Sequence, residues 1–362
     1  MQAPVPGAWR SGAQFVTGKS SMVIQSTTSK GMPKAHSTIP VGARTTLALL
    51  LLVTLIVPSV LFSQPKTSTC PPPPATPTAA EIQAMVMTAK DRGFLWKYEK
   101  SGSSGYLYGS IHLGRRKWIV PGPKTMAALQ SAEVIALELD ILDPKVQEQM
   151  SDPSRFGIKN VTLPPPLKLR METIAKRVCA PVEVLTEMHP LMQLITVAMF
   201  DARFSDLDMS YGSEMFLAGF ARGAKKPIES LETPELQMHA LLAGDAQDII
   251  ETIENGLTLF ETGKQRAQTE RLTNAWATRN LDDLQRYAEW CECMITETDR
   301  KYMKGLVDDR NPHLAASIDT LSRDGKKVFA AVGSLHMIGP NSVPNLLVKM
   351  GYKIERVVFD KL

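Results

Sequence analysis

Two histidines occur in similar short sequences near opposite ends of the folded part of the chain. His112 lies in YLYGSIHLG, residues 106–114, and His336 lies in AAVGSLHMIG, residues 330–339. In each case a β-rich run leads into Gly-Ser-aliphatic-His, and glycine there lets the backbone turn sharply and a ligand approach closely. A single such histidine is more often structural. Two imidazoles at one site, with carboxylates nearby, would suit a divalent transition metal.

Acidic side chains follow two other expected strands. Glu138 and Asp140, in ALELD, end a strand expected at 134–140, where alternation places both on the same face. Glu232, in SLETPE, ends a short strand expected at 226–232. Glu138 is expected either to act at the site or to be a buried ion-pair partner. Glu232 either acts there or interacts favourably with the N-terminus of the next helix.

An arginine precedes a predicted helix in VDDRNPHLAA. Asn311 is the expected N-cap of that helix and Pro312 its first residue. Arg310 is expected either to pair with Asp308 or to stabilise a developing oxyanion in the site. His313 is close enough to Arg310 to remain a candidate.

Other catalytic patterns are absent from the sequence. It contains no Walker loop, no GxGxxG, no HExxH and no G-x-S-x-G elbow. Ser110 and Ser334 each stand two residues before a histidine of the same turn, which is a poor arrangement for a serine nucleophile. His189 and His239 are expected to be structural, because one precedes a proline and the other lies in an amphipathic helix.

The elements that must position these residues form two similar strand-turn-helix-strand units. The first has a hairpin of FLWKYEK and YLYGSIH around SGSSG, then a helix at 123–133 and the strand at 134–140. The second has a strand at 327–332, a helix at 343–350 capped by Gly351, and a strand at 352–359. Because α/β sheets bind ligands at the carboxyl ends of their strands, both histidines are expected there. The fold class is therefore α/β (α+β), with two β-rich α/β modules sharing a central site.

A helical insertion is expected between the two units, at about 165–325. Apolar residues recur there with the i, i+3, i+4 spacing of helices in the segments 190–200, 214–222, 234–243, 246–262 and 281–289.

The first part of the chain has the composition of an export signal. Residues 1–44 carry five basic and no acidic residues, and 45–63 form an uncharged, largely apolar segment. This pattern predicts a signal peptide and a periplasmic or secreted protein, or alternatively a membrane anchor. A Pro- and Thr-rich linker follows at 64–78, and the folded domain at 79–362. The net charge of +4 comes from the leader, so the near-neutral remainder does not indicate nucleic-acid binding.

The chain contains four cysteines, which an exported protein can oxidise. Cys291-Glu-Cys293 lacks the spacing of a usual zinc or redox motif. One disulfide is expected, joining Cys179 to Cys291 or Cys293.

These motifs together resemble the TraB/GumN family, which is related to the Tiki proteases that cleave Wnt and more distantly to erythromycin esterases and ChaN. The matching pieces run in the family's order from about residue 94 to 359 and are YLYGSIHLG, VIALELD, GAKKPIESLETPELQ, AWATRNLDDL, LVDDRNPHLAASI and VFAAVGSLHMIGPNSVPNLLVKMGYKIERV. Two departures stand out. Gly212-Ser213-Glu214 replaces a Gly-x-Asp found in many relatives, and the loop of the second GxxH is one residue longer than that of the first.

The resemblance implies a manganese- or cobalt-dependent peptidase activity, as in the Tiki branch. It assigns the site to His112, His336, Glu138 and Arg310, with Glu232 as the candidate from the LET motif. The expected metal ligands are the two histidines with Glu138 and Glu232; the glutamates are also candidate general bases, and Arg310 would stabilise the oxyanion.

The expected function is therefore an exported Mn²⁺- or Co²⁺-dependent hydrolase acting on a peptide or small molecule. Two alternatives are a metal-independent histidine hydrolase of erythromycin-esterase type and a non-enzymatic envelope protein that binds haem, a metal or a peptide. The acidic residues at the strand ends favour hydrolysis over haem binding.

Overall fold

The computed structural model describes residues 70–323 and 325–361. The expected leader at 1–44, the apolar segment at 45–63 and the start of the linker lie outside these residues. Within the described part of the chain, no helix has the length and apolar character needed to cross a membrane. The first helix, α1 (Ala79–Thr88), begins where the folded domain was expected, and a capping box of Thr78 and Glu81 fixes its start.

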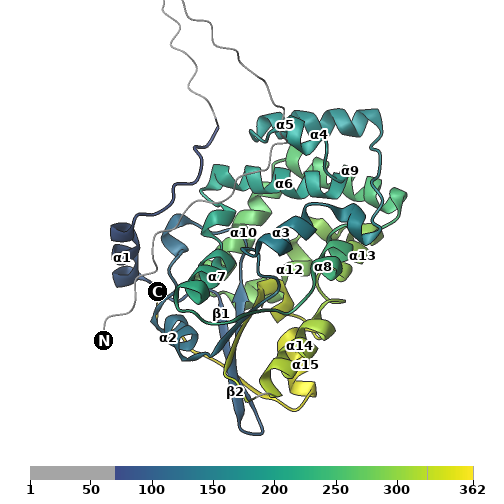
Figure 1. Cartoon of the computed structure of the whole chain (residues 1–362). Coiled ribbons are helices and arrows are strands. Elements are labelled where there is room, and N and C mark those ends of the chain that lie inside the picture. The colour runs from purple at the N-terminus through teal and green to yellow at the C-terminus, as the bar shows by residue number, and fades with distance from the viewer. Residues whose placement is uncertain (1–69, 324, 362) are drawn as a thin grey trace, which may run out of the picture. The chain divides into compact units, whose positions relative to one another are not determined.

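A single six-stranded sheet forms the centre of the fold, with strand order β4-β3-β5-β2-β1-β6 (Figure 1). Neighbouring strands among β4, β3, β5 and β2 are parallel, whereas β1 pairs with β2 and β6 in antiparallel fashion. The bounds are β1 (Phe94–Lys100), β2 (Ser103–Ser110), β3 (Val134–Leu137), β4 (Ile228–Ser230), β5 (Val328–Gly333) and β6 (Lys353–Arg356). The mixed α/β class is confirmed, and strands from both expected units lie in this one sheet.

The expected hairpin is present as β1 and β2. Its turn is shorter than SGSSG, because Lys100 already pairs with Ser103. The two turn residues, Ser101 and Gly102, have φ values of 49° and 87°. Positive φ at both positions is the requirement of the type I′ turn, whose twist matches that of the paired strands.

The central parallel strands are buried because helices cover both faces of the sheet. All residues of β3 are buried, as are all but the last residue of β5. Helices α14 (Asn311–Arg323) and α15 (Val343–Lys349) lie on one side of the sheet, and α2 (Pro123–Ser131) and α7 (Ser213–Gly223) lie on the other (Figure 1).

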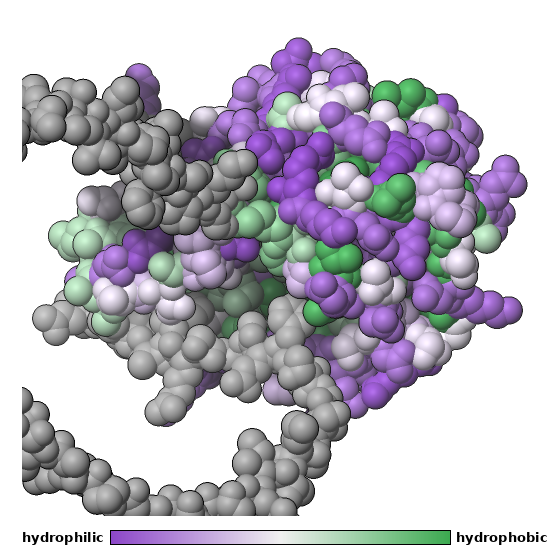
Figure 2. Space-filling view, turned by 90° about the horizontal axis from the view of Figure 1, so that it is seen from above, coloured by the Kyte–Doolittle hydropathy of each residue, from purple (hydrophilic) through white to green (hydrophobic). Residues whose placement is uncertain are grey.

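The segment between the two units is helical, as expected, and has a hydrophobic core of its own that includes Met171, Leu191 and Ile253. The face seen from above is mostly hydrophilic, with separate apolar residues between polar ones (Figure 2). The elements are α3 (Pro144–Met150), α4 (Pro165–Arg177), α5 (Val182–Leu185), α6 (Pro190–Ala202), α8 (Pro234–Leu241), α9 (Ala246–Glu261), α10 (Lys264–Thr278), α11 (Leu281–Gln285), α12 (Tyr287–Trp290) and α13 (Glu297–Leu306). The helix expected at 281–289 is thus divided into α11 and α12, and α10 was not expected.

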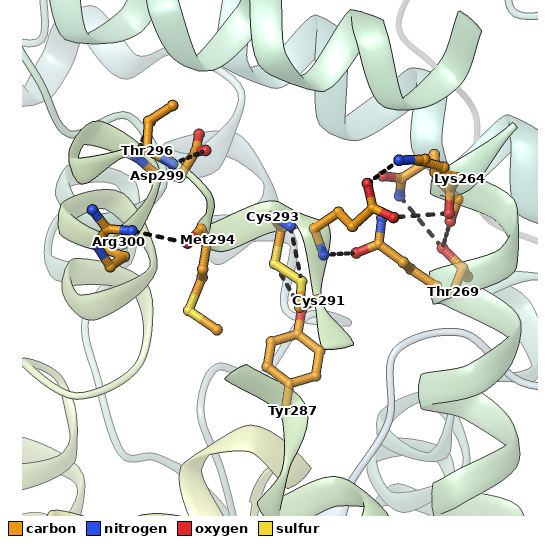
Figure 3. Close-up of a disulfide and its surroundings, with 12 residues drawn as sticks. Lys264, Thr269, Tyr287, Cys291, Cys293, Met294, Thr296, Asp299 and Arg300 are labelled. Atoms are coloured by element: carbon orange, nitrogen blue, oxygen red, sulfur yellow. Dashed lines mark hydrogen bonds and ion pairs between the residues drawn. A yellow bond between two sulfur atoms is a disulfide. The ribbon is translucent and has the colours of Figure 1, made fainter. Parts of the chain in front are cut away.

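The disulfides differ from the expected pairing. Cys179 is joined to Cys70, which lies 109 residues earlier in the chain, and Cys291 is joined to Cys293. The expected bond from Cys179 to Cys291 or Cys293 is therefore wrong. Figure 3 shows the second disulfide, where the hydroxyl of Tyr287 lies 3.3 Å from Sγ of Cys293.

Candidate functional site

The carboxyl ends of the four parallel strands meet at one edge of the sheet. Ser110, the last residue of β2, pairs with Gly333, the last residue of β5, so the two Gly-Ser-aliphatic-His turns leave neighbouring strands side by side. β3 and β4 end at the same edge, where the backbone N–H of Glu232 donates to the carbonyl of Glu138 at 3.1 Å. The structure therefore brings the turns of the two histidines and the two glutamates to adjacent strand ends, as the sequence predicted.

Glu138 is fixed by the turn that carries His336. Its Oε1 accepts a 2.6 Å hydrogen bond from the backbone N–H of Gly333 and lies 3.9 Å from Nε2 of His336. A Cβ on residue 333 would lie 3.3 Å from the same carboxylate oxygen, so glycine is the residue that allows this close approach.

Arg310 joins the two glutamates. One Nη donates to Glu138 at 2.5 Å, and the guanidinium binds Glu232 through two hydrogen bonds, of which that from Nε is 2.9 Å long. The remaining Nη donates to the carbonyl of Leu306 at 3.0 Å. The side chains of Arg310, Glu138 and Glu232 are only 13%, 10% and 1% exposed. Arg310 thus pairs with these two carboxylates and not with Asp308.

His336 is held by the residue after Arg310. Its Nδ1 lies 2.7 Å from the side-chain oxygen of Asn311. In this orientation the amide oxygen of Asn311 accepts from Nδ1, and Nε2 is the ring nitrogen that faces Glu138. Burial outweighs the attraction of Glu138 and lowers the pKa of His336 to about 4, so the imidazole is neutral at pH 7. Asn311 was expected as an N-cap; α14 begins at this residue, and its side chain serves the histidine.

Glu138 stays ionised in this buried position. Burial, the largest single influence, raises its pKa, and it is opposed by His336, Arg310, His112 and the N–H of Gly333. Together they lower the pKa of Glu138 to about 2. Because His336 is neutral near pH 7, Arg310 is the cation that holds the carboxylate at that pH.

His112 lies at the open side of the site, with its side chain 64% exposed. Its Nδ1 is 3.2 Å from Oε1 of Glu214, the same oxygen that accepts a 2.6 Å hydrogen bond from Ser110. The charge of Glu214 raises the pKa of His112, and that of Glu138 adds to this effect. Glu214 lies in the first turn of α7, and its only signal in the sequence was the replacement of Gly-x-Asp by Gly-Ser-Glu.

The hydroxyls of Ser110 and Ser334 both donate hydrogen bonds within the protein. Ser110 donates to Glu214, and Ser334 donates to the backbone carbonyl of Ser110 at 2.7 Å. Both hydroxyls therefore position the turns, which agrees with the expectation that neither is a nucleophile.

The other predicted polar residues lie elsewhere. Asp140 forms a two-bond ion pair with Arg222, at 2.8 and 2.9 Å, and does not contact the glutamates. His189 is structural, as expected, because its Nδ1 caps α6 by accepting from the N–H of Leu191. His239 and His313 are exposed on α8 and α14.

The expected metal ligands have suitable chemistry but are not gathered into one cluster. Across the described residues, no three His, Cys, Asp or Glu side chains are placed to hold a metal ion together. Glu232 and one oxygen of Glu138 are occupied by Arg310, and His112 pairs with Glu214. In this arrangement the set of His112, His336, Glu138 and Glu232 does not form a ready metal site, and we derive no step through a metal.

Comparisons with known proteins agree with this architecture. The model of the TraB/PrgY/gumN family matches residues 94–356, from the first residue of β1 to the last of β6. Metalloprotease TIKI1 of Danio rerio is 24% identical over 316 residues, covering 72% of this chain and 62% of that relative, so the chain spans about three fifths of the relative's length. No solved structure matches the chain. Since the family model covers the whole sheet and every strand end that carries the site, the chain belongs to the TraB/PrgY/gumN family.

Proposed function

We propose that this protein is a hydrolase, and specifically a peptidase. The observation that carries the proposal is the arrangement at the sheet edge, where an exposed imidazole oriented by a carboxylate lies beside a buried, fully paired ionic network. The similarity to a protein named as a metalloprotease supports the same reaction class.

The base in the proposed reaction is His112. Glu214 faces Nδ1, which leaves Nε2 as the nitrogen that takes a proton from the attacking water. Glu214 stabilises the protonated imidazole that results, and Ser110 holds Glu214 in place. This is the base-and-orienting-carboxylate arrangement common to many hydrolases.

Arg310 acts in the proposal as a positioning residue. All three guanidinium nitrogens have partners within the protein, so the group is not available as a direct oxyanion donor in this arrangement. Its effect is to help keep Glu138 ionised and to fix both glutamates behind the two histidine turns.

We extend the proposal to a requirement for a divalent ion, Mn²⁺ or Co²⁺. The support is the name of the relative and the donor chemistry of His112, His336 and Glu138. Such an ion would supply Lewis acidity and lower the pKa of bound water. The specific observation that favours a metal-independent histidine hydrolase instead is the preassembled pair of His112 and Glu214.

We also propose export to an oxidising compartment, the periplasm or the cell exterior, with anchoring through 45–63 as the alternative. The support is that the described part of the chain holds two disulfides, which persist in such compartments. N-terminal sequencing of the mature protein, together with cell fractionation, tests this proposal. An intact leader on soluble cytoplasmic protein would contradict it.

The activity is tested with a peptide library and the purified, oxidised full chain, in the presence of Mn²⁺, Co²⁺ or a chelator. We expect His112→Ala to lower kcat/KM by at least about 100-fold. Glu214→Gln should lower it by up to about 10⁴-fold, because it removes the carboxylate that orients the imidazole and stabilises its protonated form. His239→Ala, which removes an exposed histidine on α8, is the matched control and should leave the rate unchanged.

The outcomes separate the two hydrolase versions. Activity that is lost on chelation and restored by Mn²⁺ or Co²⁺ supports the metal requirement. Full activity after chelation, still abolished by His112→Ala, supports the histidine version. Turnover retained in both His112→Ala and His336→Ala would contradict the proposed site in either version.

A further inference from the structure

A cavity of about 490 Å³ is lined by residues that follow the His112 turn in the sequence. Three consecutive basic residues, Arg115, Arg116 and Lys117, belong to its lining, as does Arg203. The acidic residues of the lining are Asp206 and Asp208, so cations outnumber carboxylates in the wall.

Part of this positive charge has no carboxylate partner. Arg116 pairs with Glu81 at 2.7 Å, and Nε of Arg203 lies 3.6 Å from Asp208. No ion pair joins Arg115 or Lys117 to any carboxylate within residues 70–323 and 325–361.

The guanidinium of Arg115 is also incompletely satisfied. It stacks over the ring of Trp118 at 5.2 Å, which fixes its plane. Its Nε is buried and has no hydrogen-bond partner in the described part of the chain, and the same is true of Nε of Arg116. Buried donors are normally paired, so both guanidinium groups keep hydrogen-bonding capacity that the described residues do not use.

The segment 71–75, four prolines and an alanine, also lines the cavity and is held in place by other residues. Arg203 donates to the carbonyls of Pro71 and Pro72 at 3.2 and 2.5 Å, and the hydroxyl of Tyr211 donates to the carbonyl of Ala75 at 3.1 Å. The disulfide of Cys70 holds the start of this segment. The lining of the cavity therefore combines a fixed proline segment with basic side chains.

The chain segments at 112–114 and 208–212, whose backbones are in contact, link the cavity to the His112 site. Gly114 and Asp208 exchange hydrogen bonds of 3.1 and 2.9 Å, and a Cβ on Gly212 would lie only 2.3 Å from the carbonyl oxygen of His112. Arg115 follows His112 by three residues, which bounds their backbone separation at about 10 Å. A peptide substrate with one group bound in the cavity would thus need only a few residues to reach from there to His112, the proposed base.

We propose that this cavity binds a carboxylate of the substrate and so selects peptides with an acidic side chain or a free C-terminus near the scissile bond. Arg115 and Lys117 are the residues that recognise the carboxylate. This inference rests on the proposed peptidase function for its biological meaning, but the binding itself can be measured without turnover.

The test measures the binding of four fluorescent peptides to the full chain carrying His112→Ala, which prevents their cleavage; the peptides differ only at the C-terminus or at one internal residue. The first has a free C-terminal carboxylate and the second a C-terminal amide; the third and fourth are amides with an internal Glu or Gln. Affinity is measured by fluorescence anisotropy at low and moderate salt. The comparison variant adds Arg115→Gln and Lys117→Gln, and the matched control adds Lys159→Gln and Lys176→Gln, two exposed lysines outside the cavity.

We expect at least one carboxylate peptide to bind about tenfold more tightly than its uncharged partner, with the difference lost in the Arg115/Lys117 variant and kept in the control. The preferred peptide then identifies the source of the carboxylate. Equal affinities, no binding of any peptide, or a preference that survives the Arg115/Lys117 substitutions would overturn the proposal. Selective binding without turnover by the unmodified protein would support the carboxylate site and contradict the peptidase function.

Discussion

Replacing Arg310 with glutamine should destabilise the fold far more than removing a comparable arginine from the surface. In the native structure Arg310 is the partner of Glu138 and Glu232, which are 10% and 1% exposed at the side chain. Without the arginine, two buried carboxylates at adjacent strand ends lose their common cation. Breaking a buried ion pair by removing one partner costs about 3–5 kcal/mol, because an uncompensated charge stays buried.

The matched control is Arg222→Gln. Arg222 also makes two hydrogen bonds to one carboxylate, that of Asp140, but its side chain is 39% exposed. Solvent screens such a pair, so this substitution should cost only about 0–1 kcal/mol. The two variants remove the same chemical group, but Arg310 is buried and joins two carboxylates, whereas Arg222 is partly exposed and binds one.

A double variant separates the lost interaction from general disruption. Arg310→Gln with Glu232→Gln removes the cation and one of the stranded charges together. We expect it to cost less than the sum of the two single substitutions, by about 0.5–3 kcal/mol.

The free energies are measured by urea unfolding at pH 7.5 and 25 °C, followed by both circular dichroism and tryptophan fluorescence. If Arg310→Gln costs no more than Arg222→Gln, the buried network is not a major source of stability and our account of it is refuted. Strict additivity in the double variant would likewise refute the coupling between Arg310 and Glu232.

Two further predictions concern stability. In the chain-entropy model, replacing both cysteines of the Cys70–Cys179 disulfide with serine should cost about 5 kcal/mol of stability. The same change at Cys291–Cys293, which closes a very short loop, should cost about 1.6 kcal/mol. Urea unfolding of the two double variants checks this order, and the reverse order would contradict it. Burial raises the pKa of Asp319, but hydrogen bonds from a tyrosine hydroxyl and two basic side chains together outweigh burial and lower the pKa. The stability difference between wild type and Asp319→Asn should therefore be complete above about pH 4 and shrink as the pH falls through the lowered pKa. A difference that stays constant from pH 6 to pH 2.5 would contradict this prediction.

The strand ends of the site could be predicted from the sequence because local signals specified them. Glycine before each histidine and β-rich residues before each glycine located the two turns, and Ser110 and Gly333 prove to be register partners. The acidic residues after β3 and β4 were found by the same local reading. Each of these inferences required only the residues within about one strand and its turn.

The partners within the site could not be predicted in the same way, because they are distant in sequence. Arg310 binds carboxylates 172 and 78 residues away, and only the order of strands in the sheet brings them together. Asp308, the neighbour that local reasoning offered as an alternative, is not the partner. Asn311 shows the same limit, since its side chain contacts a histidine 25 residues later.

Elements without strong apolar periodicity were also missed. The buried side of α10 consists largely of small residues with a single tryptophan, Trp276, so its sequence lacks a clear apolar stripe. The disulfides were mispredicted because connectivity depends on which segments the fold places side by side. Cys70 stands in a proline-rich segment that composition alone marks as a linker.

The central claim is that the strand-end residues form a hydrolytic site with His112 as its base. The most direct test is mass spectrometry of a peptide library incubated with the oxidised full chain and with its His112→Ala variant, at equal folded concentrations and with Mn²⁺ or Co²⁺ present. We predict that the unmodified protein releases defined fragments and that the variant releases at least about 100-fold fewer in the same time. Equal fragment release by both proteins would contradict the account.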